Sequence, residues 1–269
     1  MSATEILAPQ HNQAILQWYL DNGVDEILES APVNRLAEKP QMVASVSKMD
    51  HASQKEASQP SSISVVGTPE LKTEADNISA AATTLEELKV AISTFEGLSL
   101  KKTAMNMVFA SGNPAAKIMV IGDAPEADDD RSGQAFSGEV GDLTDKMFAA
   151  IGLNRDGIYL TNILNWRPPG NRSPLAAEIE LSLPFIHRHI QLVKPQFIFL
   201  MGGVASKSLL GVDDTIGKLR GKIHTVISGD FSCPALVTYH PSFLLRSPLK
   251  KREAWDDLLL LKQHVLQSS

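Results

Sequence analysis

The sequence predicts an α/β protein, a three-layer α/β/α sandwich with a central, mostly parallel four-stranded sheet. Apolar runs of strand length recur along the chain at 118–122, 158–164, 196–202 and 235–240. Longer stretches with helical spacing separate or follow them, at about 139–151, 174–193, 203–210 and 250–266. The runs are almost wholly apolar, which is typical of parallel strands covered by helices on both faces.

The first 82 residues differ in composition from the rest of the chain. Residues 1–35 are predicted to be an N-terminal helical segment, with a short helix over 11–22 that ends near Gly23. Residues 36–82 are rich in Ser, Ala, Gln, Lys and Glu and have almost no aromatic side chains. Such a stretch cannot bury enough surface to offset its ordering entropy, so we expect a disordered linker.

The folded domain is expected to span residues 83–269. It begins with Thr84-Leu85-Glu86-Glu87, a match to the capping box that opens a helix to about Phe95. The four strands and their helices then follow in alternation, which is the order of repeated βαβ units.

The charge is unevenly distributed along the chain, whose net charge is −6. Residues 1–150 carry 11 Lys and Arg against 22 Asp and Glu, whereas residues 151–269 carry 14 against 9. The basic residues of the second half occur in groups that would suit a polyanion if they share a face. An ordinary solvated surface explains the charge equally well.

A single cysteine, Cys233, excludes an internal disulfide and any site built from several cysteines. There is no apolar run near 18 residues and no charged leader followed by an apolar segment. We therefore expect a soluble, unprocessed protein in the reducing cytoplasm, without membrane contact.

Polar residues follow each predicted strand at the edge where open α/β sheets bind ligands. Asp123 and an acidic stretch follow the first strand, Asn162 the second, a Gly202-Gly203 pair the third and His240 the fourth. Each has an ordinary alternative, since Asp123 could cap a helix, Asn162 could cap a turn and His240 could satisfy a carbonyl. Strand ends that deliver polar groups to one edge nevertheless favour a site.

Common catalytic motifs are absent from the sequence. It has no glycine-rich nucleotide loop and no G-x-S-x-G elbow. The acidic stretch from Asp123 to Asp130 could in principle hold Mg²⁺, which leaves a phosphohydrolase as an alternative.

Several joined motifs resemble the uracil-DNA glycosylase superfamily, and within it the family 4 branch. They are "GDAPEADDDRSGQAFSGEVG", "YLTNILNWRPPGNRSP", "FLMGGVAS", "IGKLRG" and "TYHPSFLLRSP", in order and with the expected spacing over about 84 to 266. The resemblance implies a monofunctional glycosylase that flips uracil out of DNA and cleaves its N-glycosidic bond, as in base excision repair.

The resemblance also implies roles for individual residues. Asp123 would polarise the attacking water, and His240 would donate to uracil O2 as the base leaves. Phe136 would stack on the base, and Asn162 would pair with its polar edge and so distinguish uracil from cytosine. The pocket would be completed by Gly122, Ala124 and, in a secondary or structural role, Asp129 together with Asp130.

DNA contacts are expected from the basic C-terminal half of the chain. Leu244, Leu245 and Arg246 would lie on a loop that wedges into the base stack. Further contacts would come from Arg167, Arg172 and Ser242. Besides uracil-containing DNA, a repair or replication protein could bind residues 1–35, and the protein is expected to be a monomer.

The sequence departs from the family 4 pattern in two respects. The [4Fe-4S] cluster of that branch would be held at positions that are Phe95, Leu98, Trp166 and Ser182 here, so no cofactor is expected. Near the pocket, Glu126 stands where the family has a glycine, and Ala135 stands where it has a proline. These changes leave open a catalytically weakened DNA-binding homologue as the second hypothesis.

Overall fold

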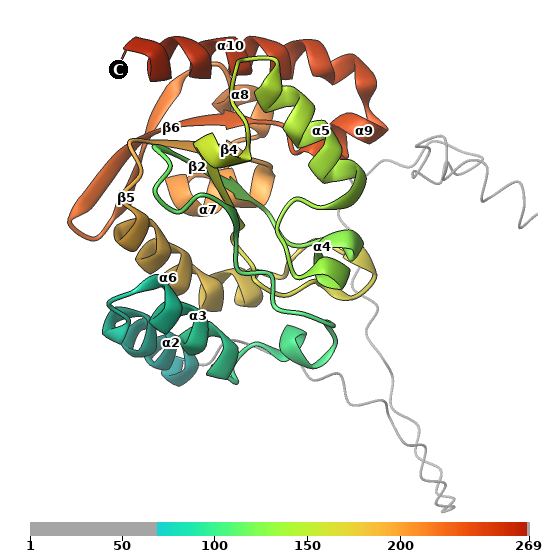
Figure 1. The fold of residues 1–269 in the computed structure, drawn as a ribbon. Coiled ribbons are helices and arrows are strands. Elements are labelled where there is room, and N and C mark those ends of the chain that lie inside the picture. Colours follow the sequence, from blue (N-terminus) through green and yellow to red (C-terminus); the bar gives the residue numbers. More distant parts are fainter. Residues whose placement is uncertain (1–68, 268–269) are drawn as a thin grey trace, which may run out of the picture. The chain divides into compact units, whose positions relative to one another are not determined.

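The computed structural model describes residues 69–267, with side chains to residue 265 (Figure 1). The predicted helical segment 1–35 and most of the predicted linker lie outside the described residues. Among residues 69–267, no helix is long and apolar enough to cross a membrane.

A six-stranded sheet with the order β1-β3-β2-β4-β6-β5 forms the centre of the structure. Its four middle strands are parallel: β2 (Ile118–Gly122), β3 (Ile158–Asn162), β4 (Phe197–Met201) and β6 (Phe231–Thr238). The antiparallel edges are β1 (Ser111–Gly112) and β5 (Ile223–Ser228). The predicted class is confirmed, but the predicted strand count of four is wrong. The missed edge strand β1 has only two residues, and in β5 the apolar residues alternate irregularly with His224, Thr225 and Ser228, so neither strand forms an apolar run.

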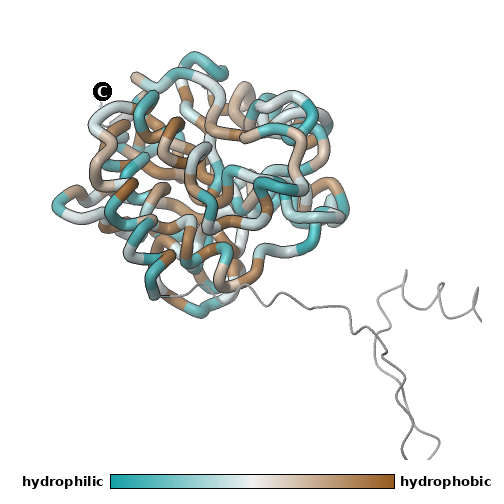
Figure 2. The backbone as a smooth tube through the Cα atoms, turned by 90° about the horizontal axis from the view of Figure 1, so that it is seen from below, coloured by the Kyte–Doolittle hydropathy of each residue, from teal (hydrophilic) through white to brown (hydrophobic). Residues whose placement is uncertain are grey.

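Helices cover both faces of the sheet, because successive side chains of a strand point to opposite sides. Met119 and Ile121 of β2 face the apolar cluster beneath α6 (Ala176–Val193) and α3 (Leu85–Thr94). Ile118 and Val120 face the cluster that includes α5 (Gly138–Ala149) and α10 (Lys251–Gln267). Figure 1 shows these two helical layers on either side of the strands. In Figure 2 the hydrophobic stretches run through the centre of the described part.

The predicted linker is wrong over its last residues, because α2 (Pro69–Ala81) is a helix that packs against α6. Leu71, Ala75 and Ile78 recur at helical spacing, and Ala75 is fully buried. The helix was not predicted because these three residues lie in a segment whose other residues are mostly polar or small. The next helix, α3, begins as predicted, with the Thr84 hydroxyl accepting the N–H of Glu87 at 3.2 Å.

The remaining elements are short and lie mainly in the connections between strands. The short α-helices are α4 (Ala127–Ser132), α7 (Gly203–Leu210), α8 (Ile216–Leu219) and α9 (Pro241–Arg246). The 3-10 turns are η1 (Ser99–Lys102), η2 (Arg155–Gly157), η3 (Pro169–Asn171) and η4 (Pro248–Lys250). The helices α4, α7 and α9 follow β2, β4 and β6, so their N-termini lie at the carboxyl edge of the sheet.

Candidate active site

Three side chains from different parts of the chain meet over Gly122, the last residue of β2. Gly122 pairs in register with Asn162, the last residue of the neighbouring β3. A methyl group built on Gly122 would collide with Asn162 Oδ1 and lie 2.8 Å from Phe136 Cζ and 3.3 Å from His240 Nε2. Only glycine therefore fits at this position, and an amide, an aromatic ring and an imidazole face one small region.

Asn162 brings an unsatisfied amide to this region. The residue is only 2% exposed, and its Nδ2 has no hydrogen-bond partner among the residues that the structure describes. A buried amide without a partner is costly, and native structures keep few of them. The side chain is suited to bind a ligand that presents both a donor and an acceptor.

His240 caps α9 and is held there by Ser242. The backbone N–H of Ser242 donates to His240 Nδ1 at 3.3 Å, and the Ser242 hydroxyl lies 2.8 Å from the same nitrogen. Burial lowers the pKa of His240 to about 4, and the Arg246 cation acts in the same direction. The ring is therefore neutral at physiological pH, and it carries its proton on Nε2, the nitrogen that faces Gly122.

Asp123 follows Gly122, and the N-terminus of α7 holds its carboxylate. The backbone N–H of Ala205 donates to Asp123 Oδ1 at 2.7 Å, and the N–H groups of Gly203 and Val204 also favour the charged form. Burial outweighs these donors and raises the pKa of Asp123 to about 6. A side chain on Gly202, whose φ is +119°, would collide with the carboxylate. This contact between Asp123 and the N-terminus of α7 was not predicted from the sequence. The Gly202-Gly203 pair after the third strand was the feature that could have indicated it.

Phe136 and Asp129 belong to the segment between β2 and α5, in which Asp129 lies on the short helix α4. The Phe136 ring is 1% exposed and lies 5.7 Å from the His240 ring, at an interplanar angle of 34°. Asp129 accepts the N–H groups of Ser137 at 2.6 Å and Glu126 at 3.0 Å, so it links the start of α4 to the residues that follow the helix. Burial raises the pKa of Asp129 to about 6. Its contacts are structural, and it does not line the cavity described next.

A cavity of about 350 Å³ opens beside these groups. Its wall includes Asp123, Ala124 and His240, the basic residues Arg172 and Arg246, and the aromatic pair Tyr239 and Phe243. The Tyr239 and Phe243 rings stack at 5.1 Å. Asn162 and Phe136, which meet over Gly122, are buried and do not line this cavity themselves, whereas His240 belongs to both groups.

The basic residues expected to contact DNA differ in their availability. Arg172 is engaged by Glu178 through two hydrogen bonds of 2.9 and 2.5 Å. Arg167 donates to Asn171 at 2.6 Å and lies 3.8 Å from the Asp130 carboxylate. Arg246 is exposed at the cavity wall and forms no ion pair with any residue in the described part of the chain.

The expectation that Leu244 lies on a wedge loop is wrong. Residues 241–246 form the helix α9, and this turns Leu244 into the core, where it is 1% exposed in the cluster with Val140 and Met147. Leu245, the next residue of the helix, is 37% exposed. Of the two leucines, only Leu245 presents an apolar surface to a ligand.

The acidic stretch does not converge as a metal site would require. Asp130 accepts the N–H groups of Met105 at 2.8 Å and Asn106 at 3.0 Å, whereas Asp128 pairs with Arg131 at 2.7 Å. Asp123 binds the N-terminus of α7, and Asp129 accepts backbone N–H groups from its own segment, so each of these four carboxylates has partners that the others do not share. No group of three or more His, Cys, Asp or Glu within residues 69–265 is arranged to hold a metal ion, which disfavours the phosphohydrolase alternative.

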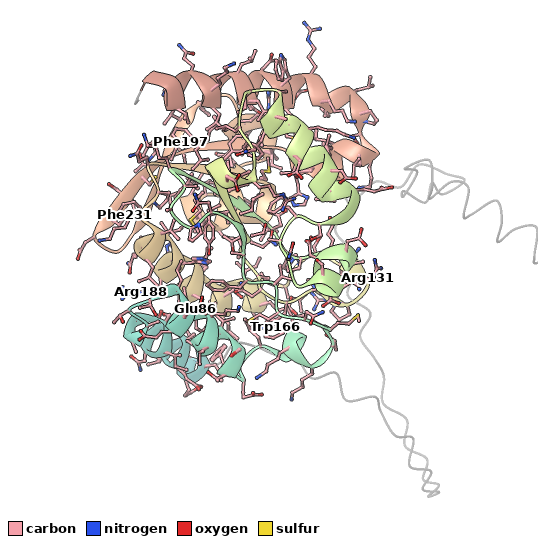
Figure 3. All side chains as sticks on the ribbon, in the orientation of Figure 1. Glu86, Arg131, Trp166, Arg188, Phe197 and Phe231 are labelled. Atoms are coloured by element: carbon pink, nitrogen blue, oxygen red, sulfur yellow. The ribbon has the colours of Figure 1, made fainter. Side chains whose placement is uncertain are left out.

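The four expected cluster positions do not fit an iron-sulfur cluster. Phe95, Leu98 and Trp166 are buried in one apolar cluster, and the Phe95 ring lies 5.3 Å from that of Phe185. Trp166, labelled in Figure 3, lies on the face of the sheet that α3 and α6 cover. Ser182 on α6 is also buried. None of these side chains supplies a thiolate, and the only cysteine, Cys233, is in β6.

Glu126 adopts an ordinary backbone conformation. Its φ is −101°, and it caps α4 in a reciprocal arrangement with Asp129. The glycine expected at this position by family resemblance is therefore not needed for a left-handed turn in this chain. Ala135 is fully buried beside Phe136 in the apolar cluster of the sheet face that α5 and α10 cover.

A family model and several known proteins that resemble this chain point to the same family. The model of the "Uracil DNA glycosylase superfamily" matches residues 109–259. The Type-4 uracil-DNA glycosylase of Archaeoglobus fulgidus is 32% identical over 177 residues, which cover 64% of this chain and 89% of that protein. The Type-4 enzyme of Pyrobaculum aerophilum is 29% identical over 65% of this chain and 92% of its own length. That of Sulfurisphaera tokodaii is 31% identical over 66% and 84%.

Proposed function

This chain belongs to the uracil-DNA glycosylase superfamily, and we propose that it hydrolyses the N-glycosidic bond of uracil in DNA at the side chains that meet over Gly122. The observation that carries this proposal is the meeting of a buried aromatic ring, an amide with a free donor and a neutral imidazole at one point. The Type-4 relatives support the same activity.

Phe136 and Asn162 recognise the base. A uracil extruded from the duplex stacks against the Phe136 ring, while Asn162 Oδ1 accepts its N3–H and Asn162 Nδ2 donates to its O4. Cytosine presents an acceptor at N3 and a donor at N4, so it is mismatched to the amide in this orientation. Binding of uracil would give the unpartnered Nδ2 a hydrogen-bond acceptor.

His240 stabilises the leaving base. As the bond between C1′ and N1 breaks, its electron pair moves onto the base and negative charge develops at O2. The Nε2–H of neutral His240 donates to this oxygen, and a donor aimed at developing charge is worth more in a buried site than in water. The Ser242 contacts at Nδ1 keep the ring in the required tautomer.

Asp123 supports the attack of water. Its carboxylate is mostly ionised at neutral pH and lies at the cavity wall, where it stabilises the cationic sugar and orients a water molecule. The water oxygen bonds to C1′, and its proton passes to the carboxylate. The donors from α7 hold the carboxylate in place during this step.

The substitution Asn162→Asp is expected to relax discrimination between uracil and cytosine, because a carboxylate can accept from the cytosine amino group but cannot donate to uracil O4. Release of each base from matched oligonucleotides, with EDTA present, gives the ratio of the two rates for the wild type and the variant. An unchanged ratio would contradict the role of Asn162. A wild-type protein that binds these oligonucleotides without forming abasic product would instead support the weakened homologue.

Removal of the Arg246 charge is expected to lower DNA affinity and reduce its salt dependence. Arg246 is free to contact a phosphate, so Arg246→Gln should decrease the slope of log K against log salt by about one. The matched control is Lys117→Gln, since Lys117 is exposed at the amino end of β2, away from the cavity. Equal slopes for wild type and Arg246→Gln in fluorescence anisotropy titrations would contradict the assignment.

A further inference from the structure

Phe136 has an unusual backbone for a bulky residue. Its φ is +57°, in the left-handed region that glycine and asparagine tolerate but aromatic side chains rarely adopt. Strained residues of this kind persist only when their surroundings hold them, and they are concentrated at functional sites. This conformation places the ring 2.8 Å from the methyl position over Gly122 and beside His240.

Arg155 supplies that support from outside the site. It lies in η2, just before β3, and its Nη2 donates to the Phe136 carbonyl oxygen at 2.6 Å. Its Nη1 donates to the Ala135 carbonyl oxygen at 3.4 Å and to Ser111 Oγ at 3.2 Å. The guanidinium is oriented by Asp145, which accepts from Nε at 2.8 Å. One side chain thus binds two consecutive carbonyls at the strained turn.

Neighbouring residues support the hydrogen bonds between Arg155 and the two carbonyl oxygens. Ser111 Oγ donates to the Ala135 carbonyl oxygen at 2.8 Å, which adds a second donor to the same turn. Gly141 in α5 leaves the space for it: a methyl group there would collide with the Phe136 carbonyl oxygen and lie 3.1 Å from Arg155 Nη2. After the turn, Asp129 holds the N–H of Ser137. The segment around Phe136 is therefore held from both sides.

We propose that Arg155 is a positioning residue for base recognition, which keeps Phe136 in its left-handed conformation so that the ring is already placed to stack on the flipped base. The inference rests on the proposed function for the identity of the stacked ligand. It differs from a purely structural surface pair between Arg155 and Asp145, because the effect of Arg155 must pass through Phe136.

The first test is a double-mutant cycle on uracil release under single-turnover conditions. Arg155→Lys keeps the charge near Asp145 but cannot span both carbonyls, and we expect roughly tenfold slower release, equivalent to about 1.4 kcal/mol. In a Phe136→Ala background the same substitution should have little further effect, because the ring that it positions is gone. Arg131→Lys, at an exposed arginine paired with Asp128, is the matched control and should leave the rate unchanged. Equal losses from Arg155→Lys in both backgrounds would overturn the proposal.

The second test needs no catalytic activity. Arg155→Lys should lower the midpoint of chemical unfolding in the wild-type background, and less so with Phe136→Gly or Phe136→Asn, whose residues adopt φ +57° more readily. Equal midpoint shifts in all backgrounds would overturn the positioning role. If the wild type released no uracil while this coupling was present, the proposed function would have failed and the positioning of Phe136 would stand.

Discussion

Replacement of His240 with Ala is expected to slow uracil release by roughly 10² to 10³, the usual cost of losing one donor to a developing anion. The imidazole is neutral, its Nδ1 accepts from Ser242, and its Nε2–H faces the point where the base would sit. Because the interaction strengthens as charge develops, the loss should appear in the single-turnover rate and hardly at all in DNA affinity.

His224→Ala is the matched control, since His224 in β5 bonds the Leu219 carbonyl oxygen and does not line the cavity. Its rate should equal that of the wild type. A His240→Ala variant within a few-fold of the wild-type rate, with its fold confirmed by circular dichroism, would remove His240 from the mechanism.

The substitution Asp123→Asn should lower the rate by roughly 10²-fold or more, in the range found for loss of a positioned acid-base group, and it should change the pH profile. With the pKa of Asp123 at about 6, the ionised carboxylate is lost as the pH falls below that value. The wild-type rate should therefore decline about tenfold per pH unit below pH 6, whereas the Asp123→Asn variant should be slow and nearly flat there. His240, with a pKa of about 4, stays neutral across this window.

Asp128→Asn serves as the control for the pH profile, because Asp128 belongs to the same acidic stretch but lies in α4, pairs with Arg131 and does not line the cavity. It should retain both the rate and the decline below pH 6. The pKa of Asp129 is also about 6. A decline that survived in Asp123→Asn would therefore assign the titration to Asp129 and contradict the role of Asp123.

Sequence reasoning predicted the fold well where the signal was local. Each of the four parallel strands contains one of the predicted apolar runs or most of it, and the capping box at Thr84 begins a helix. The expected carboxyl edge follows from these strands, because parallel strands present their ends together. Prediction failed where the signal was weak, as in α2 with its narrow apolar stripe and in the exposed edge strand β5.

The sequence by itself determined the α/β class, the family and the residue types available at the site, because periodicity and motifs depend only on residues that are close together in the chain. Only the tertiary structure decided which groups hold one another. Asp123 binds the N–H of Ala205, which is 82 positions away, and Arg155 binds the carbonyl of Phe136 across 19 positions. Leu244 is turned into the core by a helix instead of lying on a loop. Such contacts depend on how separate elements pack, and no local pattern encodes the distance between two side chains that meet only when the sheet and its helices have assembled.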